Sequence, residues 1–210
     1  MSISAPGQPA SLLTVRHRYR WRVVDLVAVA VLGSVFGIVY WAWDQLWVIT
    51  TPIFAFPPAH SMAYGVWMLP QVIAAMLVRR PGAAMFGSMS AVIVSAFMGN
   101  VFGLTVLLYG VVQGGLAEVV FAAWRYRRFN WFTAGLATGL AAVGGTFLDV
   151  VLYYPLWDDP WKYAYIIIGG LSSFVLGALL APFVIRRLAA TGALDGLPAG
   201  RTAAIKESVA

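Results

Sequence analysis

The chain has 210 residues, of which 61% are hydrophobic and 10% are charged, and its mean hydropathy is +0.81. Soluble domains carry about a quarter charged residues, so this composition is typical of an integral membrane protein and leaves no room for a soluble catalytic domain. The sequence contains no cysteine, which excludes disulfides, thiolate metal sites and cysteine nucleophiles. We therefore expect neither a cofactor nor a metal ion.

Six apolar runs are candidates for membrane-spanning helices, each of which needs about 20 apolar residues to cross the hydrocarbon layer. The third run is the shortest of the six. In chain order, the predicted spans are 23–43, 61–78, 83–97, 102–124, 131–154 and 163–185. The fold class predicted from these runs is an all-α integral membrane protein with six transmembrane helices.

The basic residues predict how the chain is oriented, because lysine and arginine collect in cytoplasmic loops. With six spans, all the basic residues except Lys162 fall on one side, and both termini are then cytoplasmic. The predicted regions are a basic cytoplasmic arm (1–22), a membrane domain (23–188) and a cytoplasmic tail (189–210) that is mobile from Thr191 onward. This topology explains the net charge of +6, so no nucleic-acid partner is expected.

Two acidic residues, Glu118 and Asp149, lie inside apolar runs, where an ionisable side chain is costly. Glu118 follows Tyr109 and Gln113, which share a helix face, and the group is either part of a polar groove or a site of helix packing. Asp149 precedes Tyr153 by one helical turn near the outer end of its span. An acid beside an aromatic ring suits a cationic aromatic ligand, although Asp149 could equally bond a neighbouring hydroxyl.

Aromatic residues are abundant, and most tryptophans fall at predicted membrane boundaries, as an interfacial belt would place them. Tyr64 and Trp67, one turn apart near the outer end of the second span, and Trp41 are the better candidates for lining a pocket. The external connection 44–60 is long and apolar, and it closes with two prolines. It is either a lid over the pocket or a half-buried interfacial segment.

Small residues in the first span allow another helix to approach closely. Ala30, Ser34 and Gly37 form the relevant face, which serves either packing within the molecule or docking of a partner protein. The sequence has no Walker-type Gly-x-x-x-x-Gly-Lys-Ser/Thr motif, so any energy that the protein uses would have to come from a partner.

A set of short motifs, taken in order, resembles the YkoE family. That family comprises substrate-capture (S) components of energy-coupling-factor (ECF) transporters for thiamine and its hydroxymethylpyrimidine (HMP) precursor. The resemblance runs from Val23 to about Leu188. The motifs that carry it are Tyr64-Gly65-Val66-Trp67, Arg79-Arg80-Pro81-Gly82-Ala83-Ala84, Gly99-Asn100, Gly110-Val111-Val112-Gln113-Gly114, Ala117-Glu118-Val119-Val120-Phe121 and Phe147-Leu148-Asp149.

This resemblance implies a ligand-binding protein of the bacterial plasma membrane that has no catalytic activity of its own. Its pocket would lie near the external side, and its partners would be a transmembrane coupling (T) subunit and cytoplasmic ATPase subunits. The expected docking residues are Ala30, Ser34 and Gly37. The expected ligand-binding residues are Tyr64, Trp67, Asn100, Gln113, Glu118 and Asp149, followed by Trp41, Tyr109 and Tyr153. Glu118 or Asp149 would accept a hydrogen bond from the aminopyrimidine or balance the thiazolium charge.

Two other functions are compatible with a small membrane protein. The chain could be an autonomous carrier or channel for another small cationic or aromatic solute. An intramembrane enzyme fits less well, because neither histidine lies within an apolar run and no base lies near Ser172 and Ser173.

Overall fold

Every element that the structure describes is a helix. The structure is a computed structural model, and it describes residues 20–53 and 56–200. The elements are α2 (Val23–Thr50), η1 (Thr51–Ile53), η2 (Pro57–Met68), α3 (Leu69–Val78), α4 (Ala83–Phe97), α5 (Thr105–Ala123), α6 (Trp131–Leu152) and α7 (Asp159–Ala190), where η marks a 3₁₀ helix. The all-α fold class predicted from the apolar runs is confirmed.

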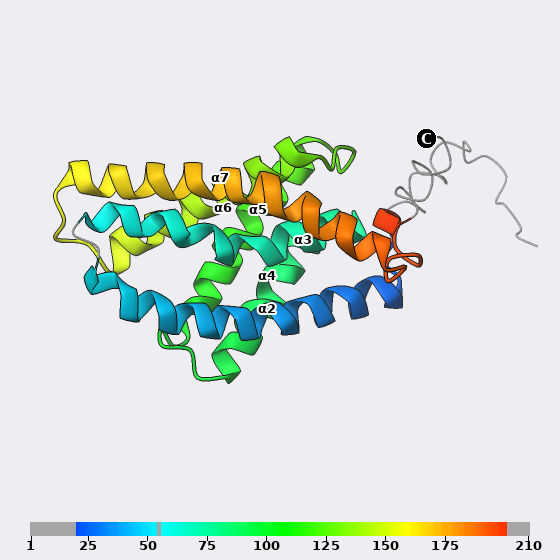
Figure 1. The fold of residues 1–210 in the computed structure, drawn as a ribbon, viewed down its shortest axis with the longest axis horizontal. Coiled ribbons are helices and arrows are strands. Elements are labelled where there is room, and N and C mark those ends of the chain that lie inside the picture. The colour runs from blue at the N-terminus through cyan, green and yellow to red at the C-terminus, as the bar shows by residue number, and fades with distance from the viewer. Residues whose placement is uncertain (1–19, 54–55, 201–210) are drawn as a thin grey trace, which may run out of the picture.

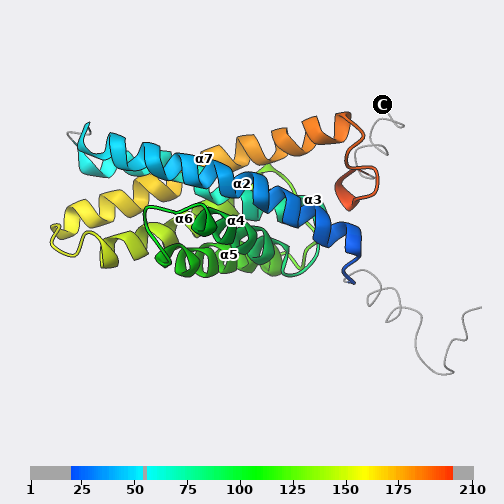
Figure 2. The ribbon, with the colours of Figure 1, turned by 90° about the horizontal axis from the view of Figure 1, so that it is seen from below.

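Helix α3 is the centre of the bundle. It carries no charged residue, and all its residues are buried, as expected for a helix that is apolar on every side. It contacts α2, α4, α5, α6 and α7. Figure 1 shows α2 and α7 along the two long sides with α3 between them, and Figure 2 shows α4, α5 and α6 together on the other side of the bundle.

The long helices have the length and composition of membrane spans. Within the described residues, five helical segments are long and apolar enough to cross a membrane, and α4 is a shorter apolar helix of 15 residues. The five segments run from Val23 to Ile53, Pro58 to Val78, Thr105 to Ala123, Trp131 to Leu152 and Asp159 to Ala190. The chain is therefore a multi-pass membrane protein, and the third predicted span is the short one.

The first helix is longer than predicted, and this changes the position of Asp44. Helix α2 continues to Thr50, so the interpretation of 44–60 as an external connection is wrong for its first part. No glycine or proline interrupts the helix between Tyr40 and Thr51. Pro52 is the first residue that opposes continuation, because it lacks a backbone N–H.

The second span has two halves with different helical geometry. Its first half is the 12-residue 3₁₀ helix η2, and its second half is α3. Runs of 3₁₀ helix longer than three or four residues are uncommon. Gly65 permits a close approach of η2 to α7, since a Cβ at this position would lie 3.1 Å from the Ser173 Cα.

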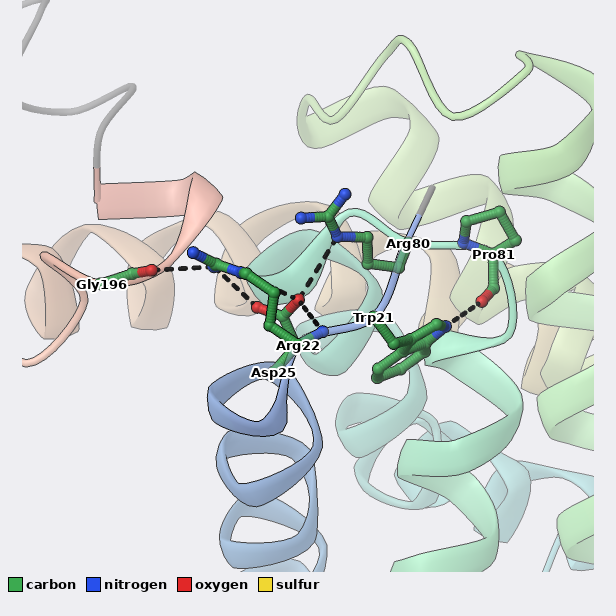
Figure 3. Close-up of polar contacts among 6 residues, drawn as sticks. All are labelled: Trp21, Arg22, Asp25, Arg80, Pro81 and Gly196. Carbon is green, nitrogen blue, oxygen red and sulfur yellow. Dashed lines mark hydrogen bonds and ion pairs between the residues drawn. The ribbon is translucent and has the colours of Figure 1, made fainter. Parts of the chain in front are cut away.

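At the end of the bundle where the described chain begins, a buried carboxylate joins three segments (Figure 3). Asp25 accepts from the Arg22 guanidinium at 2.8 Å, and its other oxygen lies 3.4 Å from Arg80 Nε. Arg22 also donates to the Gly196 carbonyl at 2.9 Å. The hydrogen bond to Asp25 raises the pKa of Arg22 above its ordinary value. The Asp25 cluster therefore connects the start of α2 with the α3–α4 turn and with the segment after α7.

The segment after α7 packs against the bundle instead of being mobile. Leu194, Leu197 and Ala199 are buried in the main core. The expectation of mobility from Thr191 is therefore wrong for residues 191–200, and residues 201–210 lie outside the described part of the chain. That expectation rested on the Gly and Pro residues of this segment. Burial of the apolar side chains at positions 194, 197 and 199 stabilises the packed position of the segment in spite of them.

Asp25→Asn is expected to lower the free energy of unfolding by about 1–3 kcal/mol, because it removes the charge that two arginines share. The measurement is thermal melting in detergent. Asp195→Asn is the matched control, since Asp195 is exposed on the same segment that Arg22 contacts. Equal melting temperatures for the two variants would contradict a stabilising role for Asp25.

Candidate functional site

A cavity of about 330 Å³ lies at the end of the bundle where α2 and α6 end, away from the start of α2. Its walls come from the second half of α2, from η1 and η2, from the α4–α5 region and from the end of α6. A volume of this size is that of a small-molecule pocket. The lining residues are Tyr40, Asp44, Trp47, Val48, Thr51, Pro52, Tyr64, Trp67, Val92, Asn100, Phe102, Val106, Tyr109, Asp149, Tyr153 and Tyr154.

The cavity brings together most of the residues that the sequence singled out as ligand contacts. Four separate elements supply them, so their meeting depends on the tertiary fold. The predicted residues that line the cavity are Tyr64, Trp67, Asn100, Tyr109, Asp149 and Tyr153. Gln113 is buried behind the wall, next to Gly145 and the Tyr64 hydroxyl, and Trp41 is not among the lining residues.

Glu118 lies away from the cavity and binds backbone groups at the start of α4. Its carboxylate accepts from the N–H groups of Gly82 (2.6 Å) and Ala84 (2.9 Å) and from the Tyr126 hydroxyl (2.7 Å). Free N–H groups at a helix start favour a carboxylate. The placement of Glu118 in a ligand groove is therefore corrected: this side chain ties α5 to the α3–α4 turn.

Glu118→Gln is expected to lower the melting temperature, because a neutral amide accepts fewer and weaker hydrogen bonds from these donors. The expected loss is about 1–2 kcal/mol of the free energy of unfolding. Thermal melting in detergent measures it, with Asp158→Asn, at an exposed position, as the control. An unchanged melting temperature would show that the carboxylate contributes nothing to the fold.

Asp44 is the main residue that the sequence interpretation missed. It is 2% exposed, it lines the cavity, and it accepts from Trp67 Nε1 (2.8 Å) and from Asn100 Nδ2 (2.5 Å). Tyr40 and Trp47 share its helix face and also line the cavity. The spacing 40, 44 and 47 was a usable signal, since such residues lie on one face once the helix is extended past Trp43.

Asp149 is held by tyrosine hydroxyls from two other helices. Tyr109 donates to Oδ1 (2.5 Å) and Tyr165 donates to Oδ2 (2.8 Å), and the Tyr64 hydroxyl lies close to the same carboxylate. Tyr153, predicted as its partner, lines the cavity but bonds to the Thr105 hydroxyl. Asp149 therefore combines the two readings left open by the sequence: it bonds neighbouring hydroxyls and also faces the cavity.

The C-terminal end of α2 is joined to η2 beside the cavity. The His60 ring stacks on Trp47 with 3.6 Å between ring centroids, and its two nitrogens lie 3.2 Å from the hydroxyls of Thr50 and Thr51. Since Trp47 and Thr51 line the cavity, these contacts form part of its wall. Residues 54–55 of the predicted lid lie outside the described part of the chain.

The charge of the cavity is negative. Its lining residues include two aspartates and no lysine, arginine or histidine. Lys162, the basic residue predicted on the external side, is not a lining residue, and its Nζ lies 3.3 Å from the Asp159 carboxylate on α7. Burial raises the pKa of Tyr154 to about 12, so its hydroxyl stays protonated. A cavity with two carboxylates and many aromatic rings can hold a flat cation through charge and π contacts.

The small residues of α2 lie on two different faces. Ala30 and Ser34 are exposed, and the Ser34 hydroxyl is satisfied by the Ala30 carbonyl (2.9 Å). Gly37 faces α4 instead, because a Cβ there would lie 2.5 Å from the Val94 Cβ. Gly37 therefore serves packing within the bundle and does not belong to an exposed docking face.

Comparisons with known proteins agree with this fold. Residues 24–144 match the family described as "ABC-type cobalt transport system, permease component". The chain is 32% identical over 182 residues to YkoE of Bacillus subtilis (strain 168), which carries the name HMP/thiamine permease protein; the match covers 86% of this chain and 91% of YkoE. A solved S component of an ECF transporter superposes with a TM-score of 0.85 at 30% identity, covering 90% of this chain and 96% of that structure.

These relatives are transport components, not enzymes, which confirms the expectation that the chain is not an enzyme. The match to YkoE covers 86% of the chain. The chain belongs to the YkoE-like family of membrane transport components and has the fold of an ECF S component.

Proposed function

We propose that this protein captures thiamine or its HMP precursor from the external side of a bacterial plasma membrane and delivers it for ATP-driven uptake. The observation that carries this proposal is the cavity, in which two buried carboxylates lie among tryptophan and tyrosine rings without a basic side chain. The name of the YkoE relative supports the choice of ligand.

The chemistry of thiamine is complementary to the lining residues. Its thiazolium ring is a flat permanent cation, which carboxylates and aromatic faces attract. Its aminopyrimidine offers an N–H donor and ring-nitrogen acceptors, which match carboxylate and amide groups such as Asp44 and Asn100. The family description mentions cobalt, but no group of three His, Cys, Asp or Glu side chains comes together in the described residues, so the cavity favours an organic cation.

In the proposed topology the six helices cross the membrane with both termini in the cytoplasm. Arg22 and Arg80 lie together at the end of the bundle away from the cavity, and basic residues favour the cytoplasmic side (Figure 3). The cavity then faces the outside, where it can meet its ligand before the transporter assembles.

The proposed partners are a transmembrane coupling subunit and cytoplasmic ATPase subunits. The exposed face of α2 around Ala30 and Ser34 is the proposed contact for the coupling subunit, because small side chains let a second helix approach closely. The structural likeness to an ECF S component supports this arrangement.

Reconstitution in liposomes tests the proposal against an autonomous carrier. The purified chain alone should bind labelled thiamine without accumulating it inside the liposome. Accumulation should require the coupling subunit, the ATPase subunits and ATP. Accumulation by the chain alone, driven by a gradient, would overturn the proposal in favour of a carrier.

Thiamine monophosphate is expected to bind at least tenfold more weakly than thiamine. Its phosphate adds negative charge, and the cavity lining offers two carboxylates and no cation to receive it. Competition against labelled thiamine measures the difference. Equal affinities would show that the phosphate lies outside the cavity and that the charge of the lining does not select the ligand.

A further inference from the structure

A basic surface lies at the end of the bundle away from the cavity. Between positions 79 and 128 the sequence has five arginines and a single acidic residue, Glu118. The arginines belong to the α3–α4 and α5–α6 turns, and none of them lines the cavity. They are Arg79, Arg80, Arg125, Arg127 and Arg128. This end of the bundle therefore carries a surplus of positive charge that ligand binding in the cavity does not use.

The two turns are packed against each other. Glu118 accepts from the Gly82 N–H (2.6 Å) and from the Tyr126 hydroxyl (2.7 Å), so one carboxylate joins both turns. The Arg79 guanidinium lies over the Phe129 ring, 5.2 Å from the ring centroid. The basic residues of the two turns therefore lie on one packed unit.

The backbone of the α5–α6 turn has an unusual, well-bonded conformation. Arg125 and Tyr126 are consecutive non-glycine residues with φ of 52° and 54°, in the left-handed region that side chains disfavour. The Arg125 N–H donates to the Ala122 carbonyl at 2.7 Å. The Tyr126 N–H donates to the Phe121 carbonyl at 2.9 Å. These two bonds satisfy carbonyls at the end of α5, and the chain reverses there, directly before Arg127.

Arg127 and Arg128 are exposed, and neither forms an ion pair in the described part of the chain. The ion pairs found there involve Arg22, Arg80 and Lys162. The nearby Glu118 carboxylate already accepts from backbone N–H groups and a tyrosine hydroxyl. Guanidinium groups donate in pairs to phosphate oxygens. The α5–α6 turn therefore offers two arginines whose chemistry suits a phosphate.

Aromatic residues place this turn at the level of lipid headgroups. Trp124 stands at the end of α5 and Trp131 at the start of α6, on either side of the arginines. Trp131 is 59% exposed, and Phe132 beside it is also exposed. Tryptophan at the ends of spanning helices is typical of the boundary between membrane and water. A basic surface at this depth meets the phosphates of phospholipids before it meets a soluble protein.

We infer that the α5–α6 turn binds the phosphate of an anionic phospholipid headgroup through Arg127 and Arg128. An anionic headgroup is favoured over a zwitterionic one because it adds no positive charge that would repel the arginines. Since α4, α5 and α6 lie together in Figure 2, a lipid bound here leaves the exposed face of α2 open to a coupling subunit. The inference needs only that the chain spans a membrane, and it is independent of the ligand that the cavity holds.

Lipid titration of the purified full-length protein in non-ionic detergent tests this assignment, with bound lipids counted by native mass spectrometry. The wild type should bind phosphatidylglycerol at least tenfold more tightly than phosphatidylcholine, because each arginine at an anionic surface adds about fivefold to the affinity. The double variant Arg127→Gln/Arg128→Gln should keep less than a threefold preference. Melting without added lipid shows that this variant is folded.

The matched control is Arg186→Gln/Arg187→Gln, which removes the same charge from exposed arginines near the end of α7. Its preference for phosphatidylglycerol should stay within twofold of the wild type. An equal loss in both double variants would show a general attraction to positive charge and no site at the α5–α6 turn. Equal wild-type affinities for the two lipids would also overturn the inference.

Two other outcomes would assign the surface to a different partner. Glycerol phosphate supplies a phosphate without acyl chains, and its displacement of phosphatidylglycerol at millimolar concentration would identify a soluble phosphate as the ligand. An Arg127→Gln/Arg128→Gln variant that keeps the lipid preference but no longer co-purifies with ATPase subunits would make the surface a protein contact. Either result would overturn the assignment to a lipid.

Discussion

Replacing Asp149 by Asn is expected to raise the Kd for thiamine at least tenfold, which corresponds to about 1.4 kcal/mol of binding free energy. The change is nearly isosteric but removes the negative charge that faces the cavity. The amide also brings N–H donors to a position where Tyr109 and Tyr165 already donate. Isothermal titration of the purified protein measures the change in Kd.

Glu118→Gln is the matched control for this result, because it is the same chemical change at a second carboxylate within the helices. Glu118 contacts Gly82, Ala84 and Tyr126, away from the cavity, so its thiamine Kd should stay within twofold of the wild type. A variant Asp149→Asn that binds thiamine normally would contradict charge pairing at the cavity. A loss of binding in Glu118→Gln would instead show that the two ends of the bundle are coupled.

Ala30→Trp is expected to abolish assembly with the coupling subunit, and hence ATP-driven uptake, while leaving the thiamine Kd of the isolated chain within twofold of the wild type. Ala30 is exposed on α2, and the α2 residues that line the cavity begin only at Tyr40. An indole at position 30 keeps a second helix from approaching. Co-purification of the tagged chain with its partner subunits measures assembly.

Val35→Trp is the control for this variant. Val35 is also exposed on α2, but it lies about 140° further round the helix at 3.6 residues per turn. It should assemble like the wild type, since it lies off the face formed by Ala30 and Ser34. Normal assembly of Ala30→Trp would show that the coupling subunit docks on another face.

The sequence was sufficient for the fold class and for six of the residues that line the cavity. Long uncharged runs have few structural solutions in a bilayer, so the helices could be predicted from composition alone. Tyr64, Trp67, Asn100 and Asp149 could be found because polar and aromatic residues stand out among aliphatic ones. Their convergence could not be found from spacing, because it depends on how η2, α4, α5 and α6 pack.

The predictions for the end of α2, for Glu118 and for the segment after α7 were wrong for physical reasons that depend on the three-dimensional structure. The predicted end of α2 is too early because Trp41 and Trp43 resemble the aromatic residues of a membrane boundary. The α-helix continues to Thr50, two residues before Pro52. Glu118 looked like a ligand residue because its hydrogen-bond donors are backbone N–H groups, which leave no trace in the sequence. Leu194 and Leu197 are buried in a segment that contacts Arg22 through the Gly196 carbonyl, 174 positions away, and contacts between such distant residues cannot be found from local sequence patterns.

Titration of the purified wild-type protein with thiamine and HMP, followed by tryptophan fluorescence, tests the central claim most directly. Trp47 and Trp67 line the cavity, so a bound ligand should change their emission. We expect a saturable change with thiamine and with HMP, and none with riboflavin as the control. The absence of a saturable change with both thiamine and HMP would contradict the proposed capture function.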